Sequence, residues 1–174
     1  MAASAFVTKL QEQIGHEFGA HQQYVAIATY YDTLTMPRMA ALFYEQAVEE
    51  REHAMMMVQY LLDKDEKVVI PALDAPNMNF SDIVEPVQLA LDQEKRVTDQ
   101  INELTRLARE ANDYASDQFM QWFIKEQVEE VAKMSDLLAV ATRSKDNYER
   151  LEDWVAREDA SASSDPTAPP IAGA

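Results

Sequence analysis

Six polar residues that can bind metal interrupt the apolar stripes of four expected helices. They are Glu17, Glu50, His53, Glu94, Gln127 and Glu130. Each lies near the middle of its helix, so a bundle that buries the stripes would bring all of them together in its core. Buried carboxylates are very costly unless they are paired or bound to metal, and no Lys or Arg lies near them on the same stripes. The pattern therefore predicts a site for a pair of divalent cations.

The spacing of these residues within each helix supports a shared metal site. Residues three apart lie on one face of a helix, so Glu50 and His53 can contact the same cation. Gln127 and Glu130 repeat this spacing, although di-iron carboxylate bundles place Glu-x-x-His on that helix. Carboxylate oxygens with one imidazole suit iron, manganese or zinc, and spacing alone does not choose among them.

Several neighbouring residues are candidates for supporting roles. Three acids that flank the expected ligands could form an accessory metal site, or they could be an ordinary solvated face: Glu49, Glu126 and Glu129. Tyr24 lies two turns after Glu17 on the same face, where it is either a core residue or a hydrogen-bond partner of a ligand carboxylate, and a possible one-electron donor. We interpret His21 as a residue that packs near the site or supports a ligand, and Trp122 chiefly as a core residue that could also donate an electron.

The periodicity predicts four long helices and one short one. The first two helices are expected at 6–34 and 37–64. The third begins at 81 and ends at a break at 112–113, the fourth runs from that break to 143, and the fifth covers 146–158. Ser81 is the expected N-cap of the third helix, which tolerates Pro86 near its first turn. Asp146 and Glu149 resemble a capping box that opens the fifth helix. The remaining residues, 159–174, have low complexity and are expected to be a disordered tail after a domain at 1–158.

The lengths of the connections predict the topology. Most connections have only a few residues, so the helices that they join should be antiparallel. Residues 65–80 form a much longer connection that could reach roughly 50 Å when extended, whereas the second helix would be about 40 Å long. This connection can therefore start the third helix parallel to the second. The fold class is an all-α four-helix bundle with a long crossover and a short fifth helix.

Composition limits the classes of partner. The chain has 174 residues and a formal net charge of −16, which disfavours nucleic acid and anionic membranes and suits cations. It has no cysteine, which excludes disulfides, thiolate zinc sites and iron–sulfur clusters and agrees with a reducing cytoplasm. No signal peptide and no apolar run long enough to span a membrane is recognisable. We therefore expect a cytoplasmic metal-binding bundle.

The sequence resembles a bacterial non-haem ferritin, a member of the ferritin-like di-iron superfamily, over about residues 5–158. The stretches that carry the resemblance are EFGAHQQY, EQAVEEREHAMMM, ALDQEK and QWFIKEQVEEV. The resemblance implies an iron-storage protein with ferroxidase activity, which oxidises Fe²⁺ with O₂ or H₂O₂ and stores a ferric oxyhydroxide mineral. It also implies a hollow cage of twenty-four identical subunits.

The resemblance also implies roles for individual residues. Glu17 and His53 would bind the first iron, Glu50 would bridge, and Glu94 with Glu130 would bind the second. The family's supporting positions are matched by Gln127 and Tyr24, and its third iron site by Glu49, Glu126 and Glu129.

Two alternatives to an iron-storing ferroxidase remain open at the level of sequence. Bacterioferritins carry a haem-ligating Met directly after the bridging Glu, and this chain has Arg51 there, so we expect no haem. A haem-free protein similar to bacterioferritin is one alternative. The other is a shell that buffers metal without catalysing its oxidation.

Overall fold

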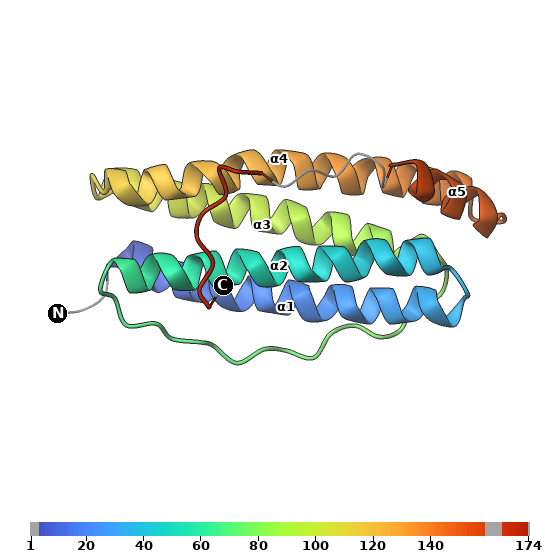
Figure 1. Ribbon diagram of the computed structural model, residues 1–174, viewed down its shortest axis with the longest axis horizontal. Coiled ribbons are helices and arrows are strands. Elements are labelled where there is room, and N and C mark those ends of the chain that lie inside the picture. The colour runs from blue at the N-terminus through green and yellow to red at the C-terminus, as the bar shows by residue number, and fades with distance from the viewer. Residues whose placement is uncertain (1–3, 159–164, 174) are drawn as a thin grey trace.

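The computed structural model describes residues 4–158 and 165–173, and this part of the chain is helical apart from its connections and the C-terminal segment 165–173 (Figure 1). The helices are α1 (Ala5–Thr33), α2 (Pro37–Asp63), α3 (Glu85–Glu110), α4 (Tyr114–Arg143) and α5 (Tyr148–Glu158). These bounds confirm the predicted four long helices and short fifth helix. None of the described helices is long and apolar enough to cross a membrane.

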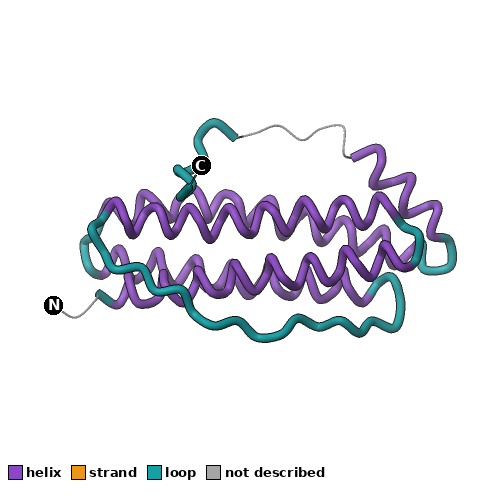
Figure 2. Tube along the Cα trace, turned by 60° about the horizontal axis from the view of Figure 1, so that its bottom comes forward, coloured by secondary structure: helices purple, strands orange, loops and turns teal. Residues whose placement is uncertain are grey.

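The four long helices form two antiparallel pairs, α1 with α2 and α3 with α4. The connection from α2 to α3, residues 64–84, runs along the whole length of the bundle in both views (Figures 1 and 2). Consequently α2 and α3 run in the same direction, as the length of this segment predicts. The three other connections are short turns.

Single residues with a positive φ angle end the first three helices. Thr35, Asp65 and Asn112 have φ angles of 58°, 56° and 54° and follow α1, α2 and α3. A left-handed residue after a helix lets the chain turn back sharply while the last carbonyls keep hydrogen bonds. Asp113 then caps α4, because its Oδ1 accepts a hydrogen bond from Ser116 N at 3.2 Å.

The start of α3 differs from the expectation that Ser81 is its N-cap. The helix begins at Glu85, and Asp82 Oδ1 accepts hydrogen bonds from the amides of Val84 and Glu85, at 2.9 and 3.0 Å. This start places Pro86 in the first turn, where its missing N–H removes no helical hydrogen bond. Ser81 instead donates to the Glu85 carboxylate through its amide and its hydroxyl.

The start of α5 also differs in detail from the expected capping box of Asp146 and Glu149. Asn147 caps the helix instead, since its Oδ1 accepts from Arg150 N at 3.1 Å. One turn into α5, the Glu152 carboxylate accepts hydrogen bonds from the amides of Arg38 and Met39, at 2.9 and 2.8 Å. These amides belong to the first turn of α2, so α5 supplies the cap that α2 lacks locally.

A buried polar layer divides the core into two apolar clusters. One cluster, near α5, includes Tyr24, Phe43 and Met134, and the other, toward the opposite end, includes Ile14, Met57 and Phe123. Glu17 lies between Ile14 and Tyr24 along α1, and it is 1% exposed. The long helices therefore hold a polar layer at mid-height with apolar packing on both sides of it.

The C-terminal segment, residues 165–173, crosses the outside of the bundle from α4 to α2 (Figure 1). Asp165 Oδ2 accepts hydrogen bonds from Trp122 Nε1 and Lys125 Nζ, at 3.2 and 3.1 Å. Ala172 N donates to Met55 O at 3.2 Å, and Ile171 packs against one apolar cluster. These contacts contrast with the expected disordered tail, of which 159–164 and 174 lie outside the described residues.

Two glycines of α1 allow a matched test of how the crossover segment packs. A Cβ atom at Gly15 would lie 2.4 Å from Pro71 Cγ, whereas a Cβ at Gly19 would meet no heavy atom within 4 Å. Gly15→Ala should therefore lower the free energy of unfolding by about 1–3 kcal/mol, because the added methyl group overpacks against Pro71. Gly19→Ala should raise it by up to about 1 kcal/mol, because Ala favours helix. Thermal denaturation of both variants beside the parent measures the difference. Equal stabilisation by both substitutions would show that Pro71 moves aside without cost.

Candidate metal centre

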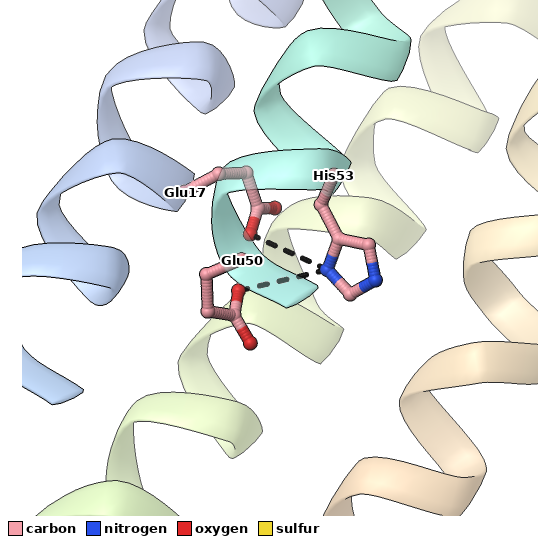
Figure 3. Close-up of side chains that lie close together, drawn as sticks. All are labelled: Glu17, Glu50 and His53. Atoms are coloured by element: carbon pink, nitrogen blue, oxygen red, sulfur yellow. Dashed lines mark ion pairs between the residues drawn. The ribbon is translucent and has the colours of Figure 1, made fainter. Parts of the chain in front are cut away.

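Glu17, Glu50 and His53 converge at the centre of the buried polar layer (Figure 3). His53 Nδ1 lies 3.6 Å from Glu50 Oε2 and 4.0 Å from Glu17 Oε2. One donor atom from each residue lies within 4.8 Å of the others. Since α1 supplies one residue and adjacent turns of α2 supply two, the packing of the first helix pair builds this group.

Two carboxylate oxygens in this group accept no hydrogen bond from the described residues. They are Glu17 Oε2 and Glu50 Oε1, and both are buried. Burial raises the pKa of both carboxyl groups well above the ordinary value, and their mutual proximity adds to the shift for Glu17. A divalent cation between these oxygens and the imidazole would supply the charge that the surrounding core does not. The donor set therefore fits a metal ion.

Glu94 lies in the same layer but is held by hydrogen bonds. The Tyr24 hydroxyl donates to Glu94 Oε1, and Gln127 Nε2 donates to Glu94 Oε2 at 3.2 Å and to its carbonyl oxygen at 3.1 Å. Burial raises the pKa of Glu94, whereas these two donors lower it. Gln127 therefore turns its amide nitrogen toward Glu94, a supporting contact that leaves its amide oxygen available.

Glu130 completes the layer from α4. Gln46 Nε2 donates to Glu130 Oε2 at 2.9 Å, and Glu130 is 4% exposed. Burial raises the pKa of Glu130 to about 7, against the opposing influence of the nearby Lys133 ammonium. The charges of Glu94 and Glu130 in turn raise the pKa of Glu50, after burial itself. Because the pKa of all four carboxyl groups is raised, cations compete with protons for this layer.

A surface pocket of about 520 Å³ adjoins this centre on the α2–α4 side. His53 and the three flanking acids line it together with the C-terminal segment: Glu49, Glu126, Glu129, Asp165 and Ile171 are among the lining residues. Lys133 Nζ lies 3.9 Å from Glu49 Oε2, and Lys125 Nζ lies 3.9 Å from Glu129 Oε1. The flanking acids thus share a pocket, but in the described residues the tight convergence of three donors is confined to Glu17, Glu50 and His53.

The aromatic and histidine candidates lie beside the centre. The Trp122 ring contacts the His53 ring edge-on, with 5.6 Å between ring centroids. His21 Nδ1 donates a hydrogen bond to Ala47 O at 2.6 Å. Trp122 is half-buried and lines the pocket, so it is not a plain core residue.

Sequence reasoning missed two residues next to Glu130. Gln46 is fully buried on α2, one turn before Glu50, and Lys133 reaches it from α4. Gln46 is a polar residue in the apolar stripe of α2, which was a usable signal. The sequence argument excluded nearby positive charges only on the apolar stripes. Lys133 lies beside the stripe of α4, so that argument did not consider it.

Comparison with known proteins agrees with this architecture. Residues 7–144 match the family described as the Ferritin-like domain. The chain is 52% identical over 168 residues to ferritin BfrB of Mycolicibacterium smegmatis, covering 97% of this chain and 93% of the relative. It is 34% identical over 151 residues to the bacterial non-haem ferritin of Staphylococcus epidermidis, covering 87% of this chain and 91% of the relative.

A solved structure shows the same fold. The open-pore ferritin of the archaeon Archaeoglobus fulgidus matches with a TM-score of 0.87 at 24% sequence identity, covering 93% of this chain and all of the other. At this identity the likeness concerns the fold alone: a four-helix bundle with a short C-terminal helix. Together with the match over residues 7–144 and the identity to relatives along nearly the whole chain, it shows that the chain belongs to the ferritin family.

Proposed function

We propose that this protein is an iron-storing ferroxidase, which oxidises Fe²⁺ in the buried polar layer and stores the ferric product. The observation that carries the proposal is the convergence of Glu17, Glu50 and His53 with two buried carboxylate oxygens that lack hydrogen bonds within the described structure. Membership of the ferritin family supports iron as the substrate. Glu94 and Glu130, in the same layer, supply the carboxylates for a second ion.

In this proposal the two Fe²⁺ ions occupy neighbouring positions in the layer. Glu17 and His53 hold the first, Glu94 and Glu130 hold the second, and Glu50 bridges them. Each Fe²⁺ gives up one electron, so a pair reduces O₂ with two protons to H₂O₂, or reduces H₂O₂ with two protons to two waters. Anionic oxygen ligands stabilise Fe³⁺ over Fe²⁺ and thereby favour this electron transfer. The Tyr24 hydroxyl holds Glu94 in place and is a possible one-electron donor.

Removal of the shared ligands tests the catalytic proposal. Glu50→Ala combined with His53→Ala should abolish fast Fe²⁺ oxidation, because it removes the proposed bridge and the imidazole. The bundle should still fold, since loss of a buried charge removes a desolvation cost. Oxygen consumption after addition of Fe²⁺ measures the activity. Glu45→Ala, at an exposed acid on α2, is the matched control.

The same measurement separates the ferroxidase from a shell that only buffers metal. A parent protein that binds Fe²⁺ anaerobically but consumes no oxygen would support the buffer. Oxidation by the double variant at the parent rate would place the reaction elsewhere in the protein.

We further propose that Glu49, Glu126 and Glu129 hold a third, weaker iron in the surface pocket, passing iron between the centre and the stored mineral. All three line the pocket, and His53 lines it too, so the pocket touches a proposed ligand of the first iron. Replacing all three acids by Ala should leave two cations bound per chain. It should change the number of Fe²⁺ oxidised per O₂ and slow repeated turnover.

Measurement of the iron-to-oxygen ratio over successive Fe²⁺ additions tests the third site. A charge-matched control replaces three exposed acids outside the pocket: Glu12, Glu45 and Glu110. If the triple pocket variant kept the parent ratio and the parent rate of repeated turnover, the pocket acids would be an ordinary solvated face.

We also propose a closed cage of twenty-four chains without haem. The crossover segment exposes large apolar side chains, Ile70 and Met78 each at 57%, that a partner chain would cover. Light scattering should give about 480 kDa for twenty-four chains of 19.8 kDa. The same sample, offered haem, should show no Soret band, because exposed Arg51 cannot ligate haem iron as a Met would. A monomer or dimer at micromolar concentration would contradict the cage, and a stoichiometric Soret band would indicate a bacterioferritin-like protein.

A further inference from the structure

Gln46 is a wholly buried amide that the proposed ligand set does not use. It lies on α2 four residues before Glu50 and is 0% exposed. Its Nε2 donates to Glu130 Oε2 at 2.9 Å, and its Oε1 accepts a hydrogen bond from Lys133 Nζ. Gln46 therefore connects a lysine at the edge of the bundle to a carboxylate in the polar layer.

Lys133 determines which end of the amide faces Glu130. An ammonium group can only donate hydrogen bonds, so it must meet the amide oxygen and not the amide nitrogen. The nitrogen of Gln46 is then left to face Glu130 Oε2. Lys133 also pairs with an acid, because its Nζ lies 3.9 Å from Glu49 Oε2.

This arrangement restricts how Glu130 can bind a cation. The hydrogen bond from Gln46 takes one lone pair of Oε2 and restrains the orientation of the carboxylate, which leaves Oε1 and the second lone pair of Oε2 for a cation. Hydrogen bonds from neighbouring groups commonly orient metal-binding carboxylates in this way. We propose that Gln46 and Lys133 are positioning residues that hold Glu130 for the second cation. This inference rests on the proposed two-cation centre.

The first cation should not depend on this pair. Gln46 and Lys133 bond or pair with Glu130 and Glu49, and neither makes a hydrogen bond or an ion pair with Glu17 or His53 in the described structure. A role in packing alone would perturb the whole bundle, whereas a positioning role should alter one binding step of two. The selectivity of the effect therefore distinguishes the two roles.

Anaerobic titration with Co²⁺, followed by visible absorption of the bound ion, resolves the two steps. The parent should bind two Co²⁺ per chain in the polar layer, and the step lost in Glu130→Ala identifies the second. Gln46→Met keeps a similar volume but removes both hydrogen bonds. It should weaken the second step by about 10- to 100-fold, as is typical for loss of a group that orients a metal ligand, and leave the first step unchanged.

Variants of Lys133 extend the test without altering the core, because this side chain is 42% exposed. Lys133→Met should weaken the second step, and Lys133→Arg, which keeps a positively charged donor, should restore it. Lys125→Met is the matched control: it removes a lysine that, like Lys133, lies beside one of the pocket acids. Lys125 pairs with Glu129 and Asp165, and no hydrogen bond between Lys125 and Gln46 is present among the described residues. Combining Gln46→Met with Lys133→Met should add little to either change alone if the pair acts as a unit.

The possible results lead to different conclusions. If Gln46→Met titrates like the parent, or if Lys125→Met weakens the second step as much as Lys133→Met does, the positioning role is wrong. If the parent binds no pair of cations in the layer, the proposed function fails and this inference fails with it. Weakening of the second step alone in Gln46→Met and Lys133→Met, with rescue by Lys133→Arg, would support the pair.

Discussion

The structure depends on the burial of four carboxyl groups in one layer of an otherwise apolar bundle. Glu17, Glu50, Glu94 and Glu130 are each at most 4% exposed. Burial raises the pKa of every one of them. An isolated layer of this kind would weaken a short bundle, but here an apolar cluster packs on each side of it. The length of the helices therefore has a direct function, since it separates the costly layer from both ends of the molecule.

The hydrogen bonds in the layer are not distributed evenly over its carboxylate oxygens. Glu94 and Glu130 receive hydrogen bonds from Tyr24, Gln127 and Gln46. In the other half, Gln13 Nε2 donates to Glu17 Oε1 at 2.8 Å, whereas Glu17 Oε2 and Glu50 Oε1 receive no hydrogen bond from the described residues. A carboxylate oxygen without a donor gains more from a cation than one that already has a donor. On the proposed function, these two oxygens are therefore the ones that gain most from the first cation.

Much of this site could be predicted from the sequence because helical periodicity converts spacing into direction. The stripes placed the main candidates in one layer, and chain lengths gave the crossover. The stripes could not identify Lys133, since its long side chain reaches the layer from a position beside the stripe. The prediction of Ser81 as the N-cap of α3 was wrong, because the side chain of the next residue, Asp82, accepts the amide hydrogen bonds there. Composition alone suggested disorder for a C-terminal segment that Asp165 ties to Trp122, forty-three residues away in the chain.

Charge in the surface pocket sets how firmly a cation can stay there. Lys133 Nζ lies within 4 Å of Glu49 and Lys125 Nζ within 4 Å of Glu129, so a cation that binds either acid competes with an ammonium group. Both acids are also substantially exposed, 43% and 62% for their side chains, and water screens them. Among the described residues no lysine or arginine pairs with Glu17 or Glu50, whose nearest basic group is the His53 imidazole, and these carboxylates are far less hydrated. The proposed third position is therefore the weaker one, which suits a site through which iron passes and not one where it stays.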